Sequence, residues 1–187
     1  MEKKQAIKAV LATTLCHVLW GFSFMASSRA LSAANVFVLL SHRFLIAFTL
    51  MSLMTLAGFA KLSLKGKRIL PLVALGLMEP VIYFFGEQYG IIYAGTVFSG
   101  VMIAMIPVFC MLAAAPILRE KPTAGQVAFS VISVAGVIGL GLMGGSAGTV
   151  KLIGVIALIV AVIGAAGYTL LSRSISKQFT GTINMKQ

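Results

Sequence analysis

The chain has 187 residues, of which 59% are hydrophobic before glycine is counted, and a formal net charge of +11 from fifteen basic and four acidic side chains. Soluble domains contain about 45–50% apolar residues with glycine included, so the composition excludes an ordinary soluble domain and indicates an integral membrane protein. The two cysteines, Cys16 and Cys110, fall inside apolar runs, and no disulfide or metal framework is readable from them.

Six apolar runs are long enough to cross a hydrocarbon core about 30 Å thick. We therefore predict an all-α membrane protein with about six transmembrane helices joined by short connections. The first run follows "MEKK" and precedes "MASSRA", as in a secretory signal peptide. It is long for a signal peptide and five further runs follow, so we expect it to remain as an uncleaved transmembrane helix. The expected spans are 7–26, 36–59, 69–88, 95–118, 124–143 and 152–171.

Basic residues gather at alternate ends of these spans. Only Arg29 and Lys151 lie in the other set of loops, and Arg43 lies within a span. The positive-inside rule then places both termini in the cytoplasm. Anionic lipid is the natural neighbour of such residues, so we expect a lipid bilayer and no nucleic acid as partner. The twelve residues on the cytoplasmic side are Lys3, Lys4, Lys8, Lys61, Lys65, Lys67, Arg68, Arg119, Lys121, Arg173, Lys177 and Lys186.

A faint internal repeat links the first and last spans. The segment "WGFSFMASSRAL" aligns with "GAAGYTLLSRSI" at an offset of 144 residues, which matches Ser28 and Arg29 with Ser172 and Arg173. An odd number of spans separates the two segments, so the repeats would have opposite orientations in the membrane.

Several motifs in order resemble an EamA-type domain of the drug/metabolite transporter superfamily. They are "LWGFSFMASSRAL", "SHRFLIAF", "YFFGEQYGIIYAGTVFSGVMIAMIPVF" and "REKPTAGQVAFSVISVAGVIGL". The resemblance implies a complete five-helix domain over 7–143, followed over 152–187 by the first helix and cytoplasmic tail of an incomplete second domain. Because members carry ten helices as two inverted domains, the offset implies a parent of about 288 residues and a chain shortened before helices seven to ten.

The resemblance also implies a function. EamA-type proteins move small metabolites or drugs across the bacterial inner membrane by alternating access, so we expect a secondary transporter, an exporter, with a small-molecule substrate. The residues show no nucleophile paired with a base and too few acids for a metal site, so we expect neither an enzyme nor a cofactor. Two alternatives stay open, namely a non-transporting membrane subunit and a half-transporter that acts as a homodimer or with a complementary half.

Glu79 is the main candidate for substrate contact or ion coupling. It lies about 15 Å into the third span, where a charge costs at least about 2.5 kcal/mol on insertion scales. A carboxyl group removed from water can take up and release a proton near neutral pH. Pro80 follows it and predicts a kink or an unwound turn. A structural ion pair with Arg43, at a similar depth from the outer end of the second span, is the other interpretation of Glu79.

Other candidates surround these residues. Glu87 is expected near the outer interface. A structural role and a role in attracting substrate are both open for it. Pro107 is expected to interrupt the fourth span near its middle, as a packing kink or as a substrate-facing break. His17 lies one turn before Gly21 on the first span, where a structural role is the commoner one. Aromatic side chains that suit a cavity wall are Trp20, Tyr83 and Tyr168.

Small residues suggest helix packing. Ser130, Ser133, Gly136 and Gly139 recur every three residues along the fifth span, which we interpret as a structural stripe for packing or dimerisation. The last span is expected to leave the face around Gly164, Gly167 and Tyr168 open, because its own repeat supplies no further helices.

Overall fold

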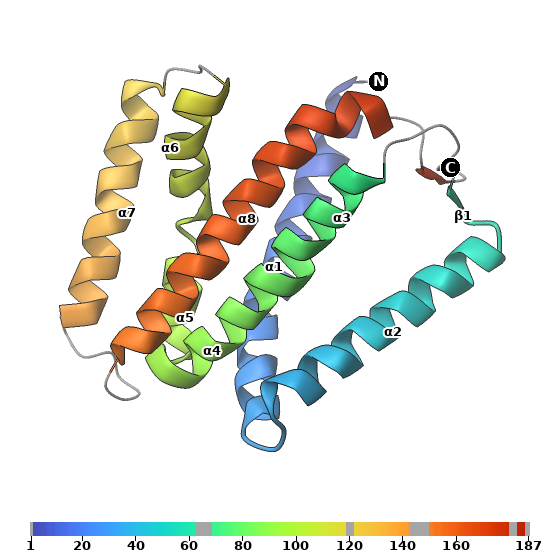
Figure 1. Ribbon diagram of the computed structural model, residues 1–187. Helices are drawn as coiled ribbons and strands as arrows, with labels where there is room; N and C mark the ends of the chain where they lie inside the picture. The colour runs from blue at the N-terminus through green and yellow to red at the C-terminus, as the bar shows by residue number, and fades with distance from the viewer. Residues whose placement is uncertain (1, 63–68, 119–121, 143–149, 180–182, 186–187) are drawn as a thin grey trace.

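The computed structural model describes residues 2–62, 69–118, 122–142, 150–179 and 183–185, and these are almost entirely helical (Figure 1). The predicted all-α class is confirmed. The basic residues at 63–68 and 119–121, and residues 143–149, where a loop was predicted, lie outside the described residues. In chain order the elements are α1 (Glu2–Leu31), α2 (Val36–Leu56), β1 (Ala60–Leu62), α3 (Leu70–Gly76), the π-helix η1 (Leu77–Tyr83), α4 (Phe84–Ala94), α5 (Thr96–Ile103), α6 (Ile106–Leu118), α7 (Ala124–Leu142), α8 (Leu152–Phe179) and β2 (Ile183–Met185).

Five stretches of the described chain are long and apolar enough to cross a membrane. They are Ala6–Leu31, Val36–Leu56, Leu70–Ala94, Thr96–Pro116 and Leu152–Ile175. The sixth predicted span corresponds to α7, whose apolar part, Ala124–Gly139, is shorter. The N-terminal end of α1 and the C-terminal end of α8 lie on the same side of the bundle (Figure 1), which we call the N-terminal side.

Two short strands were not predicted. β1 and β2 pair antiparallel, with Ala60 opposite Met185 and Leu62 opposite Ile183. Each strand has three residues, so the pair joins the end of the second span to the end of the chain without adding a layer to the fold.

Local capping explains where several helices begin and end. The Asn35 side chain accepts a hydrogen bond from the Val38 N–H at 2.9 Å and starts α2. The third span continues to Ala94, because the first positive φ, +84°, comes at Gly95, a conformation that glycine adopts without strain. The prediction that this span ends near residue 88 is therefore wrong, since Gly90 stays within the helix.

The helix α8 forms the centre of the bundle and packs most closely on η1 and α4 (Figure 1). Leu158, Ala161 and Val162 of α8 are fully buried. Glycines allow the close approach: a Cβ added at Gly86 would lie 2.6 Å from the Ala157 carbonyl oxygen. Small residues let membrane helices pack backbone to backbone in this way.

The expectation of an open face on the last span is wrong for its glycines. A Cβ at Gly164 would lie 3.0 Å from the Met78 carbonyl oxygen, and one at Gly167 would lie 3.2 Å from the Met78 sulfur. The π-helix of the third span therefore covers this face. The stripe on α7 differs, because a Cβ at Gly136 or Gly139 would meet nothing within 4 Å among the described residues.

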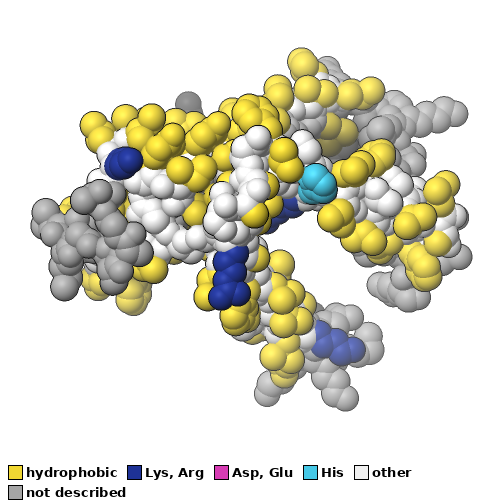
Figure 2. Space-filling model, turned by 90° about the horizontal axis from the view of Figure 1, so that it is seen from below, with side chains coloured by type: hydrophobic (Ala, Val, Ile, Leu, Met, Phe, Trp, Pro, Cys, Tyr) yellow, Lys and Arg dark blue, Asp and Glu magenta, His cyan; other side chains and the backbone are white. Residues whose placement is uncertain are grey.

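The helices α1 and α2 lie at the edge of the bundle. The end of α2 near Val36 is buried, whereas its other end diverges from the remaining helices (Figure 1). Phe48, for example, is 71% exposed. Seen from the side opposite the N-terminus, hydrophobic side chains cover most of the described surface, with basic residues at a few places (Figure 2). Such a surface suits lipid or another apolar partner.

Candidate functional site

The third span contains a π-helical segment at Glu79 and Pro80. Both residues lie within η1. Proline has no N–H to donate to the preceding turn, and its ring clashes with the carbonyl group four residues earlier, so a wider turn relieves the clash. The interruption predicted from Pro80 is confirmed. It takes the form of a π-helix, a rare conformation that is frequent at functional sites.

Glu79 lies on this π-helix beside Tyr168 of α8. Its carboxyl group is half-buried and interacts with the Tyr168 hydroxyl group. Removing a carboxylate from water is costly in a membrane, and a hydroxyl donor replaces part of the lost hydration. This contact therefore links the third and the last spans through polar groups inside the bundle.

One turn further along, the last residue of η1 and the beginning of α4 bury three polar side chains. Tyr83 is 1% exposed, and Glu87 and Gln88 are fully buried. The Gln88 side-chain amide donates a hydrogen bond to Glu87 Oε2 at 3.2 Å. Tyr83 and Glu87 are four residues apart, so both side chains lie on one face of the helix. We call Arg43, Tyr83, Glu87 and Gln88 the buried polar cluster.

The Tyr83 hydroxyl group lies close enough to Glu87 and Trp20 to interact with both. Three atoms of the cluster nevertheless form no hydrogen bond of good geometry with the described residues. They are the Tyr83 hydroxyl oxygen, Glu87 Oε1 and Gln88 Oε1. A buried polar atom without a partner costs about 1–3 kcal/mol, and more when it is charged. Most buried polar atoms in proteins are therefore paired. Three atoms without a good hydrogen bond, lying close together, indicate that these side chains have a role besides stabilising this conformation.

Arg43 joins the cluster from α2. Its guanidinium carbon lies 4.4 Å from the centroid of the Phe84 ring, which favours a cation–π interaction. Its charge also acts on Glu87 and on Tyr83. Aromatic pairs hold α2 against the third span here, with ring centroids 5.5 Å apart for Phe44 and Phe84 and 5.2 Å apart for Phe37 and Phe85.

The ion pair considered between Arg43 and Glu79 is not the contact that the structure contains. The Arg43 charge acts on Glu87 instead, and Glu87, which was expected at a position with access to water, is fully buried. The reason is the extension of the third span to Ala94, which places Glu87 about seven residues, or about 10 Å, inside its end. Arg43 lies about as far inside the neighbouring end of α2, so these two depths match.

Two aromatic predictions have different outcomes. The Trp20 ring lies 6.2 Å from the Tyr83 ring, so Trp20 covers the buried polar cluster from α1. His17 is exposed, with its Nδ1 atom 2.8 Å from the Thr13 carbonyl oxygen and its ring 6.1 Å from Trp20. His17 therefore lies outside the cluster.

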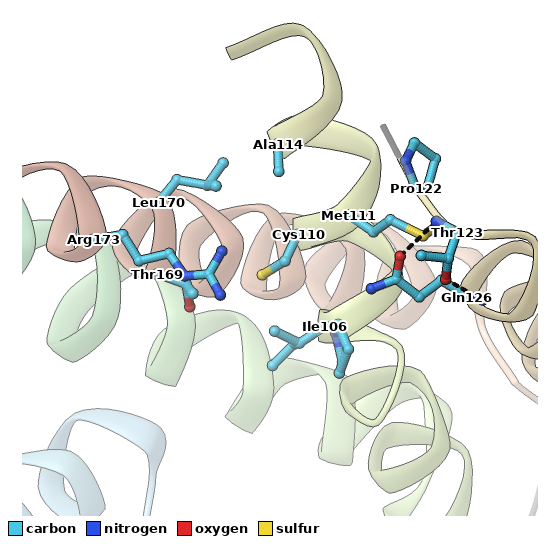
Figure 3. A pocket seen from close by; sticks show the side chains of 11 residues that line it. Ile106, Cys110, Met111, Ala114, Pro122, Thr123, Gln126, Thr169, Leu170 and Arg173 are labelled. Atoms are coloured by element: carbon cyan, nitrogen blue, oxygen red, sulfur yellow. Dashed lines mark hydrogen bonds between the residues drawn. The ribbon is translucent and has the colours of Figure 1, made fainter. Parts of the chain in front are cut away.

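Pro107 lies at a break in the fourth span, as predicted. α5 ends at Ile103 and α6 begins at Ile106, with Pro107 in its first turn. Pro107 also lines a cavity of about 740 Å³ between α6, α7 and α8 (Figure 3). The structure thus brings together Trp20, Arg43, Tyr83 and Glu87 and pairs Glu79 with Tyr168. Pro107 lies apart from both groups, at the cavity between α6, α7 and α8.

Some residues of these sites were not predicted from the sequence. Gln88 stands directly after Glu87 in an apolar run, and its polar side chain was an available signal. Arg173 was interpreted only as a basic residue of the cytoplasmic tail, yet it lines the cavity together with Gln126. Gln88 lies in the EamA-like motif around Glu87 and Arg173 in the internal repeat, but only the packing of the helices shows that Gln88 is buried and that Arg173 lines the cavity.

Comparison with known proteins supplies the family. Residues 7–142 match the EamA-like transporter family. YcxC, an uncharacterised transporter of Bacillus subtilis, is 33% identical over 180 residues, which cover 96% of this chain and 58% of that protein. An uncharacterised transporter of Archaeoglobus fulgidus is 29% identical over 175 residues, covering 91% of this chain and 58% of the relative.

A third relative has a more specific name. The probable terminal-alkyne amino-acid exporter of Streptantibioticus cattleyicolor is 32% identical over 145 residues, covering 75% of this chain and 47% of that protein. No solved structure matches the chain. The chain spans about half to three-fifths of the length of these curated relatives. It belongs to the EamA-like transporter family, within the drug/metabolite transporter superfamily.

Proposed function

We propose that this chain forms part of a secondary transporter that exports small metabolites or drugs across the bacterial inner membrane by alternating access. Its membership of a transporter family supports the general activity. The name of the Streptantibioticus relative supports export as the direction and suggests amino acids as the first compounds to test.

The buried polar cluster is the observation that carries this proposal. An arginine, a glutamate, a glutamine and a tyrosine meet between apolar helices, and three of their polar atoms form no hydrogen bond of good geometry with the residues that the structure describes. Ionisable residues within membrane spans usually mark substrate or ion pathways. In a second conformation of the transporter, a substrate or water would reach these atoms and satisfy them.

The proposal requires a complementary half. In it, residues 7–143 form one five-helix repeat, residues 152–187 begin an inverted second repeat, and the substrate lies between two repeats that move against each other. The greater length of the relatives supports a half within a longer chain. On α7, a Cβ added at Gly136 or Gly139 would meet no atom of the described residues within 4 Å, which favours a second copy as another source of that half.

Membrane orientation is a further part of the proposal, with both termini in the cytoplasm. A cysteine introduced as Ser146→Cys, in a variant whose two natural cysteines are replaced by serine, tests it. Position 146 lies outside the described residues, in a loop that the charge distribution places on the outer side. Labelling by a membrane-impermeant thiol reagent from outside is expected, and labelling only from the cytoplasm would contradict the orientation.

Transport is tested in vesicles loaded with radiolabelled amino acids and small aromatic acids. We expect saturable efflux when the chain is reconstituted at densities where cross-linking shows association, and none at densities where it is monomeric. Robust efflux by the monomer would overturn the need for a complementary half. Absence of efflux at every density and for every compound would favour the alternative, a non-transporting membrane subunit.

A further inference from the structure

Two tyrosines and a lysine form a small cluster where α4 ends and α8 begins, on the side of the bundle opposite the N-terminal side (Figure 1). The Lys151 ammonium nitrogen lies 5.8 Å from the centroid of the Tyr93 ring, which favours a cation–π interaction. The Tyr89 and Tyr93 rings are stacked, with centroids 6.4 Å apart and planes 8° from parallel. We call Tyr89, Tyr93 and Lys151 the tyrosine–lysine cluster.

Backbone contacts hold this cluster in place. The Lys151 N–H donates a hydrogen bond to the Tyr93 carbonyl oxygen at 2.9 Å. A Cβ added at Gly154 would lie 2.7 Å from the Ala94 nitrogen, so the end of α4 and the start of α8 touch. Tyr89 is one turn before Tyr93 on the same face of α4. The positions of the three side chains are therefore set by closely packed backbone.

The cluster lies at the ends of two stretches that are long and apolar enough to cross a membrane. Leu70–Ala94 ends one residue after Tyr93, and Leu152–Ile175 begins one residue after Lys151. Tyrosines are enriched at this depth, and a lysine there extends its ammonium group towards the lipid headgroups. In the set of predicted loops that contains Lys151, Arg29 is the other basic residue. Lys151 is thus an exception to the charge pattern of the chain.

The positive charge of Lys151 is exposed, and the Tyr93 ring that it contacts is neutral. Counted from Ala94, Glu87 and Glu79 lie about 10 Å and about 22 Å deeper in the third span. An anion that approaches from the membrane surface would therefore meet no acid of the described third span at the depth of Lys151. An ammonium group and two tyrosine hydroxyl groups are all donors that suit the oxygens of a phosphate group.

Apolar side chains beside the cluster distinguish a lipid from a free phosphate ion. Leu152, Ile153 and Ile156 follow Lys151 in the first turns of α8, and all three are exposed, Leu152 to 74%. A free phosphate ion would leave this surface uncovered. A phospholipid would place its phosphate group at the cluster and its acyl chains against the apolar side chains, which favours their burial.

We propose that the tyrosine–lysine cluster binds the phosphate group of an anionic phospholipid. The Lys151 ammonium group and the tyrosine hydroxyl groups donate to the phosphate oxygens, and the acyl chains lie along Leu152 and Ile156. The bound lipid covers the junction of α4 and α8. Binding at this place does not depend on transport, so it is measured without a substrate.

A tryptophan beside Lys151 measures this binding at one place. Trp20 is the one tryptophan in the sequence, so in a Trp20→Phe, Leu152→Trp chain the tryptophan fluorescence comes from the start of α8. The chain is reconstituted in phosphatidylcholine bilayers that contain phosphatidylglycerol or phosphatidylcholine with brominated acyl chains. Bromine quenches a nearby tryptophan, so the two quenching curves give the preference for phosphatidylglycerol at this position. The control reporter is Trp20→Phe with Phe37→Trp, at the start of α2 on the same side of the bundle.

We expect a preference for phosphatidylglycerol of about fivefold at the Leu152→Trp reporter and of less than about twofold at the Phe37→Trp reporter. Lys151→Gln should abolish the preference at Leu152→Trp, and Lys151→Arg should keep most of it. Tyr93→Phe, which keeps the ring and removes the hydroxyl group, should lower it. An unchanged emission maximum in phosphatidylcholine alone shows that the surroundings of the reporter are intact in each variant. Lys151→Arg carries the test if Lys151→Gln fails this control.

An equal preference at the two reporters would overturn the proposal, because it would show a general attraction of anionic lipid to this side of the protein. A preference that persists in Lys151→Gln would overturn it as well. Loss of the preference when excess inorganic phosphate is added at constant ionic strength would also contradict it and would assign the cluster to a free anion.

Discussion

The two sides of the third span are packed in opposite ways. Towards α8, glycines bring the backbones together, and Leu158 is fully buried. Towards α2, aromatic rings and Arg43 make the contact at one end, and Phe48 further along α2 is 71% exposed. The helix α8 is held against the third span by close backbone contacts, whereas α2 contacts that span near one end only.

This difference shows how the chain combines a rigid core with an adjustable site. Close-packed helices resist small displacements, so we expect α4 and α8 to move as one body. Arg43 lies on the loosely attached helix and Glu87 on the rigid one. A displacement of α2 would therefore change the separation of these two charges without disturbing the centre of the bundle.

The largest expected effect comes from adding volume to the rigid contact. Gly86→Leu should lower the free energy of unfolding by about 3 kcal/mol, because the added side chain meets the Ala157 backbone. Unfolding by a denaturing detergent would measure it. Gly136→Leu on α7 is the control, and it should change that free energy by no more than about 0.5 kcal/mol. Equal losses from both substitutions would contradict the account of the packing.

The next effect concerns the loosely attached side. Arg43→Gln and Glu87→Gln should show a coupling free energy of about 1 kcal/mol in a double-mutant cycle, a modest value because Arg43 is only half-buried. Arg43→Gln combined with Glu79→Gln is the matched control and should be additive within about 0.5 kcal/mol. Stronger coupling of Arg43 to Glu79 would restore the pairing first considered from the sequence.

Removing the Tyr83 hydroxyl group should have a small effect on stability. Tyr83→Phe deletes a buried oxygen that forms no hydrogen bond of good geometry with the described residues, so the free energy of unfolding should change by less than about 0.5 kcal/mol or rise. Ser99→Ala is the comparison, because the buried Ser99 hydroxyl donates to the Gly95 carbonyl oxygen at 2.7 Å and its loss should cost about 1 kcal/mol. A larger cost at Tyr83 would mean that its hydroxyl group is paired.

The smallest effect is expected on the free part of α2. Phe48→Leu should leave the free energy of unfolding unchanged within about 0.5 kcal/mol, because this side chain is exposed and its replacement is also apolar. Phe84→Leu should cost about 1 kcal/mol by removing the ring that contacts Arg43 and Phe44. The same unfolding assay compares them, and a cost for Phe48 as large as that for Phe84 would show that α2 is held along its whole length.

Hydropathy alone predicted the helical class and the approximate spans, and Pro80 and Pro107 predicted the interruptions of two of them. The end of the third span could not be predicted from the sequence, because the segment with Tyr89, Gly90 and Tyr93 resembles a turn at the membrane interface. In the structure this segment continues the helix and packs against α8. The contacts between residues of different spans could not be predicted from the sequence either. A π-helix changes the number of residues per turn, so the faces of α4 cannot be counted forward from the start of the span.

The central claim is that the buried polar cluster serves transport, and Glu87→Gln tests it most directly. The substitution keeps the shape of the side chain and removes its charge. In vesicles where the parent chain shows saturable efflux, we expect Glu87→Gln to lower the initial rate at least about tenfold, a change of about 1.4 kcal/mol in the barrier. Arg29→Gln, which removes an exposed charge at the end of α1, should keep the parent rate. Equal rates for Glu87→Gln and the parent, at matched amounts of folded protein, would contradict the claim.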